Sequence, residues 1–151
     1  MSAPEGTLEG LAAADAHLGR PVPLPTVALP LTRWTEVRAA GPEGVEIAWN
    51  LDDSRAGAPG RLALYAGLEA PPPRDWPSPD PGREVPVDGA PGRWREAELV
   101  EAQPSLRPAV ELSWHAHGLY LRLTAQGPWP PARLLEIAAS VRPPRPVEDP
   151  R

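Results

Sequence analysis

Cysteine, lysine and phenylalanine are all missing from this chain of 151 residues. Without cysteine the chain has no disulfide, no thiolate metal site and no cysteine nucleophile. It also lacks a run of the ~20 apolar residues that a membrane-spanning helix needs. The amino terminus has neither the positive start nor the apolar stretch of a signal peptide. We therefore expect no membrane span and a cytoplasmic location, or an exported protein if a signal has been trimmed.

The basic residues are all arginine, and the formal net charge is -5. An acidic chain is poorly suited to bind phosphate backbones, so no nucleic-acid partner is expected. The 24 prolines, together with arginine in place of lysine, have two interpretations. One is the coding bias of a GC-rich genome. The other is adaptation to heat, since proline in loops and few thermolabile residues favour thermostability.

The length is typical of one domain, which we place at residues 1–142. Half of the residues from Pro71 to Gly82 are proline. Such a segment cannot pair within a sheet, so it is predicted to be a surface loop inside the domain. Residues 143–151 are predicted to be a flexible tail.

Strict alternation of apolar and polar residues predicts strands. Between Gly44 and Leu51 the apolar positions are Val45, Ile47 and Trp49, which is the period of a half-buried strand. The segment 61–66 returns as its hairpin partner. The same pattern predicts five further strands, at residues 32–39, 83–87, 93–100, 110–115 and 118–124.

A short helix is predicted after Thr7, which can cap it, with Gly19 as its end. A second helix is predicted after the prolines at 130 and 131. Its apolar stripe at helical spacing consists of Leu134, Leu135, Ile137, Ala138 and Val141. The order of elements lacks the βαβ alternation of a parallel sheet. The fold class is therefore α+β with two layers: a curved antiparallel sheet of about five to seven strands, with both helices on one face.

Two histidines have the spacing of a metal site. At strand spacing His115 and His117 share a face, although His117 falls at a turn and only Glu111 is near enough in sequence to add a ligand. Exposed hairpin histidines are the more common explanation of this pattern, so no metal site is predicted. No serine stands in the G-x-S-x-G pattern of a nucleophile, and no glycine motif cradles phosphate. The sequence thus predicts no catalytic residue and no cofactor.

Six tryptophans accompany the absence of phenylalanine. Trp49, Trp94 and Trp114 fall at core positions of predicted strands. The other three, Trp34, Trp76 and Trp129, are the candidates for a binding surface or pocket. The position of Trp34 is ambiguous, whereas Trp76 and Trp129 lie among prolines, and loop indoles beside proline suit a protein-binding surface.

The carboxy-terminal third has a familiar pattern. It consists of the strand ending in Trp114, a glycine turn, the strand containing Tyr120, and the closing helix that ends in Ile-Ala-Ala-Ser-Val141. Taken loosely over residues 20–141, the chain resembles a bacterial domain of unknown function that forms the extracytoplasmic carboxy-terminal part of some anti-sigma factors and lipoproteins. The resemblance implies an antiparallel sheet with a helix across one face and a sensory or binding role. It carries no catalytic residues.

The sequence thus favours a non-enzymatic binding or regulatory module, whose partner is another protein or an apolar small molecule. Two alternatives remain open. One is a small hydrolase that uses histidine and carboxylates in the cleft between sheet and helices. The other is a purely structural accessory domain.

Overall fold

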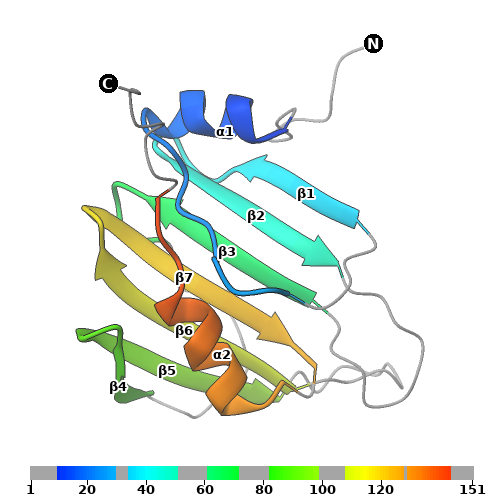
Figure 1. Cartoon of the computed structure of the whole chain (residues 1–151), viewed down its shortest axis with the longest axis vertical. Coiled ribbons are helices and arrows are strands. Elements are labelled where there is room, and N and C mark those ends of the chain that lie inside the picture. The colour runs from blue at the N-terminus through cyan, green and yellow to red at the C-terminus, as the bar shows by residue number, and fades with distance from the viewer. Residues whose placement is uncertain are drawn as a thin grey trace, which may run out of the picture.

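The computed structural model describes residues 10–29, 34–50, 61–71, 82–98, 108–127 and 129–143. These residues form two helices and seven strands (Figure 1). In chain order they are α1 (Gly10–Leu18), β1 (Trp34–Ala39), β2 (Gly44–Asn50), β3 (Arg61–Gly67), β4 (Arg83–Val87), β5 (Ala90–Glu98), β6 (Pro108–Ala116), β7 (Leu119–Gln126) and α2 (Pro131–Ala139). Neither helix is long and apolar enough to cross a bilayer within this part of the chain.

The strands form a single sheet in the order β1-β2-β3-β7-β6-β5-β4, and every neighbouring pair is antiparallel. The predicted antiparallel sheet of five to seven strands is therefore confirmed at its upper limit. Consecutive strands are neighbours in the sheet except for β3 and β4: β7 returns to lie between β3 and β6, and β4 forms the far edge. This return places the long hairpin of β6 and β7 in the middle of the sheet.

Two of the hairpins close through two residues with positive φ. Asp88 (φ 48) and Gly89 (φ 82) join β4 to β5, and His117 (φ 56) and Gly118 (φ 74) join β6 to β7. Two consecutive residues in this region make the tight turn that matches the twist of the strands. The sequence predicted a wider turn over residues 88–92. Because Asp88 and Gly89 complete the reversal alone, β5 begins at Ala90, earlier than predicted.

Most of the buried apolar residues form one cluster that contains one face of the sheet and parts of both helices. Four members of this cluster are between 0% and 6% exposed: Leu112, Trp114, Leu121 and Ile137. From the helices the cluster includes Ala14, Leu18, Leu134 and Ala138. The period-2 alternation of the strands thus places their apolar face toward this cluster.

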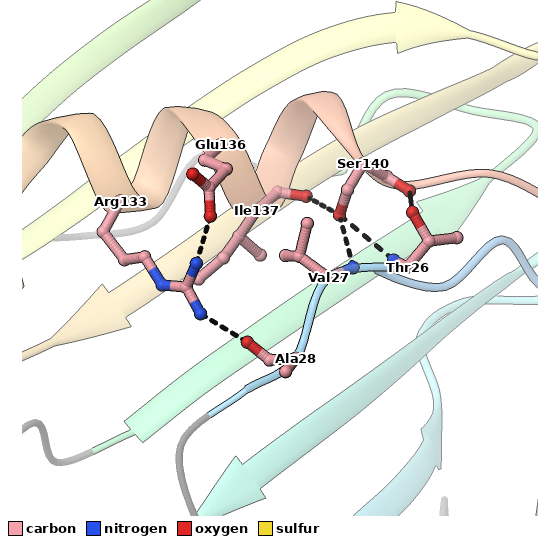
Figure 2. A network of polar contacts seen from close by, with 7 residues as sticks. All are labelled: Thr26, Val27, Ala28, Arg133, Glu136, Ile137 and Ser140. Atoms are coloured by element: carbon pink, nitrogen blue, oxygen red, sulfur yellow. Dashed lines mark hydrogen bonds and ion pairs between the residues drawn. The ribbon is translucent and has the colours of Figure 1, made fainter.

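A polar network joins α2 to the extended segment that follows α1 (Figure 2). The hydroxyl of Ser140 donates to the carbonyl of Ile137 (2.7 Å) and accepts from the amide of Thr26 (3.1 Å). Arg133 contacts both the carboxylate of Glu136 and the carbonyl of Ala28. Further along, Leu24 and Arg142 exchange two backbone hydrogen bonds of 3.0 Å. These contacts bind the segment at residues 20–29 to the carboxy-terminal part of the chain, and Figure 1 shows it passing in front of the sheet.

The helices differ in detail from the prediction. In α1 the buried residues are Ala14 and Leu18, whereas Leu11 is 43% exposed. The last helix ends at Ala139, and Val141 is buried after the helix has ended. Thr7, most of the proline-rich loop and most of the predicted tail lie outside the described residues.

Candidate functional site

An apolar groove lies between α1, the segment at residues 24–29 and the edge of the sheet formed by β1 and β2. Its volume is about 480 Å³, and its lining consists of Gly10, Leu11, Leu24, Pro25, Leu29, Thr35, Val37, Ile47 and Trp49. No ionisable side chain is among these residues. The volume is in the range of pockets that hold small organic ligands, roughly 300–1,000 Å³.

The floor of the groove is the apolar face of two strands at the edge of the sheet. Val37 pairs with Ile47, and Thr35 pairs with Trp49. Ile47 is fully buried at 1% exposure, whereas Trp49 and Val37 are half-buried and only pack against the margin of the core. The apolar face of the sheet therefore extends beyond what the core cluster covers.

Hydrogen bonds hold the two walls of the groove, α1 and the segment at residues 24–29, in place. Nε2 of His17, in the last turn of α1, lies 2.8 Å from the carbonyl of Gly41 in the turn between β1 and β2. A carboxylate oxygen of Asp15 accepts from the amide of Val22 (2.8 Å), directly after Gly19 ends the helix with φ 82. The bridge between Leu24 and Arg142 fixes the opposite wall. The contacts that hold the walls thus do not involve the side chains of β1 and β2 that form the floor of the groove.

The structure does not bring the two histidines of the β6–β7 hairpin to one site. His115 is exposed and meets Tyr120 edge to face, with ring centroids 4.9 Å apart. Nε2 of His117 lies 3.1 Å from the carbonyl of Val141, a residue of the core cluster. The positive φ of His117 explains the difference, because a turn residue does not continue the side-chain alternation of a strand. Within the described residues no group of three potential ligands could hold a metal ion.

The three candidate tryptophans have different positions. Trp129 is 7% exposed and belongs to the core cluster, and its indole N–H donates to the carbonyl of Gln126 (3.1 Å). Trp34 begins β1, with a side chain outside the described residues, and Trp76 lies outside them altogether. The indole that lines the groove is Trp49, which the sequence assigned to the core.

The sequence indicates which face of β2 carries Trp49, but not whether that face is covered. Its alternation places Trp49 correctly on the apolar face of β2. Whether that face is covered at this point depends on where α1 and the segment at residues 24–29 lie, and no local pattern states that. One indication was available: a strand at the edge of the sheet, as β1 is, lies where the covering of the apolar face ends.

The sequence matches no known family model and no curated protein. The resemblance of its carboxy-terminal part to a bacterial domain therefore stays a prediction.

Proposed function

We propose that this chain is a non-enzymatic binding module that holds an apolar small molecule in the groove between α1, residues 24–29 and the strands β1 and β2. The proposal includes a two-layer α+β architecture in which both helices lie on the apolar face of the sheet. In that arrangement the groove is the part of the interlayer space that side chains leave open. The regulatory role implied by the family resemblance would act through occupation of this groove.

The single observation that carries the proposal is an apolar lining at a fixed, uncharged opening. Trp49 offers a large flat surface for a ligand. Leu11, which also lines the groove, is 43% exposed. Burying apolar area is favourable by roughly 25 cal/mol for each Å² removed from water. A ligand that covers Trp49, Val37 and Leu29 therefore gains affinity without desolvating a charge.

The hydrolase alternative receives less support from the contacts of the histidines. His17 and His117 each place Nε2 against a backbone carbonyl, and His115 packs on Tyr120. A histidine that acts as a base needs its second nitrogen oriented by a carboxylate or a similar group. Within the described residues none of the three histidines forms a salt bridge or hydrogen bond with a carboxylate.

The test uses N-phenyl-1-naphthylamine, a neutral apolar dye whose fluorescence rises in a dry site. We expect the wild-type chain to bind it and the variant Val37→Asp to lose this binding, because a carboxylate would then stand in the groove. Trp49→Leu should weaken binding and reduce the energy transfer from tryptophan to the dye, because five other indoles remain.

The matched control is Leu68→Asp, since Leu68 is 37% exposed and does not line the groove. It should bind the dye as the wild type does. Circular dichroism must show that each variant retains its sheet. Equal dye binding by folded Val37→Asp and by wild type would refute the proposed site.

A further inference from the structure

The face of the sheet opposite the core cluster carries a continuous row of polar side chains. One line of directly paired residues crosses every strand of the sheet. From β1 to β4 it consists of Arg38, Glu46, Tyr65, Arg122, Ser113, Arg93 and Glu84. Charges of opposite sign alternate near its two ends. At its centre, Arg122 has uncharged neighbours on both sides in the row.

A cavity of about 670 Å³ lies on this face over β5, β6 and β7. Its polar lining consists of Arg93, Arg95, Glu111, Ser113, His115, Tyr120 and Arg122, and Ala70 and Pro71 form part of the lining. The arginines outnumber the one carboxylate, although the whole chain has a formal net charge of -5. The cavity is therefore a cationic site on an acidic protein, which favours an anionic ligand.

The guanidinium group of Arg122 is held in position. Arg122 is only 7% exposed, and its guanidinium carbon lies 5.7 Å from the ring centroid of Tyr65. Arg93, Arg95 and Arg122 all have further contacts within the chain. A guanidinium has five N–H donors in a planar fork, so contacts within the protein are compatible with binding a ligand oxygen as well.

Glu111 adds a second requirement for the ligand. Its Oε2 is buried and has no hydrogen-bond partner among the described residues, and the same holds for Oγ1 of Thr124, the residue opposite Glu111 on β7. A buried carboxylate oxygen without a donor is unfavourable, because the hydrogen bonds that it loses to water are not replaced. A ligand hydroxyl or amino group in the cavity would supply the missing donor.

We propose that this cavity binds a small organic anion, with its carboxylate or phosphate group at the arginines and a hydroxyl or amino group donating to Glu111. Carboxylate and phosphate share the oxygen geometry that the guanidinium fork recognises. The site is separate from the apolar groove and does not depend on it. The aromatic pair of His115 and Tyr120 borders the site at the β6–β7 turn.

The test is calorimetric titration of the full chain with two pairs of probes. Malate and succinate are dicarboxylates that differ by one hydroxyl group, and 2-hydroxyethyl phosphate and ethyl phosphate provide the same contrast for phosphate. We expect the hydroxylated member of at least one pair to bind at millimolar concentration or better. It should bind roughly tenfold more tightly than its partner, as for one hydrogen bond to a charged group.

Three variants assign the contacts. Arg93→Gln, at an exposed position, and Arg95→Gln should each weaken binding by about tenfold or more. Glu111→Met keeps the length of the side chain but removes its acceptor, so the preference for the hydroxylated probe should disappear. The control is Arg83→Gln, because Arg83 is exposed on the neighbouring strand and lies over the ring of Trp94, a core residue.

Each outcome decides the proposal. Binding of only one pair identifies the anionic group as carboxylate or phosphate and supports the site. Failure of both pairs to bind the folded wild type overturns it. Binding that Arg93→Gln and Arg95→Gln leave unchanged, or that Arg83→Gln reduces equally, also overturns it, since the anion would then bind elsewhere.

Discussion

Replacing Ile137 with alanine tests the packing of α2 on the sheet. Ile137 is 0% exposed and belongs to the single core cluster with Leu112 and Leu121. Truncation removes the buried methyl groups and leaves a cavity that the neighbouring side chains fill only partly. Such changes lower the free energy of unfolding by about 2–5 kcal/mol. For a domain of this size each kcal/mol lowers the melting temperature by roughly 2–4 °C, so a decrease of roughly 4–20 °C is expected.

The assay is urea unfolding followed by tryptophan fluorescence and by circular dichroism. The matched control is Glu136→Ala, on the preceding residue, whose side chain is 56% exposed. Its ion pair with Arg133 is at the surface, where such pairs contribute little, about 0–1 kcal/mol. If Ile137→Ala and Glu136→Ala unfold at the same urea concentration with equal slopes, the inferred packing of α2 is incorrect.

Three further predictions concern single contacts. Ser140→Ala removes the hydroxyl that accepts from the amide of Thr26, but this amide keeps the backbone carbonyl of Ser140 (3.2 Å) as an acceptor. The free energy of unfolding in urea should therefore fall by about 0.5–1.5 kcal/mol; an unchanged midpoint would contradict this. In Gly67→Ala the new Cβ would lie 2.1 Å from the Tyr65 hydroxyl oxygen, so the melting temperature should fall. A melting temperature equal to that of the wild type would show that the Tyr65 ring moves freely. Burial raises the pKa of Tyr65 above its usual 10.0, although the charge of Arg122 opposes this. The unfolded chain then loses its phenolic proton first, so stability should fall as pH rises above 10.0, and Tyr65→Phe should remove this decrease in urea unfolding at alkaline pH.

The strands could be predicted because their signal is local. In β2 and β7 each apolar residue is two positions from the next, and the structure places these residues in one cluster. Glycine and aspartate at the turns indicated where the strands reverse. The prediction for residues 88–92 was too wide because a Pro-Gly pair follows, and Pro91 is accommodated within β5 opposite Pro86 of the edge strand β4.

The groove could not be predicted because contacts between distant segments build it. The pairing of Leu24 with Arg142 and the network of Thr26 with Ser140 position one wall. No pattern in either segment indicates its partner. Trp129 shows the converse: neighbouring prolines suggested an exposed loop, but its indole belongs to the core cluster, and its amide donates to the carbonyl of Gly127 (2.9 Å).

The polar cavity depends on register across several strands. Arg93, Ser113 and Arg122 are distant in sequence and become neighbours because β5, β6 and β7 pair side by side in this register. Sequence alternation does place each of them on the polar face of its own strand. What it lacks is the strand order, which decides that arginines from β5 and β7 meet above β6.

Amide hydrogen exchange with and without N-phenyl-1-naphthylamine tests the central claim most directly, because it locates the ligand rather than only detecting it. Binding in the groove should slow exchange in β1, in the adjoining part of β2 and at residues 24–29, and should leave β4 and β5 unchanged. Protection concentrated in β5, β6 and β7, or none at a dye concentration that saturates fluorescence, would contradict the assignment of the groove as the ligand site.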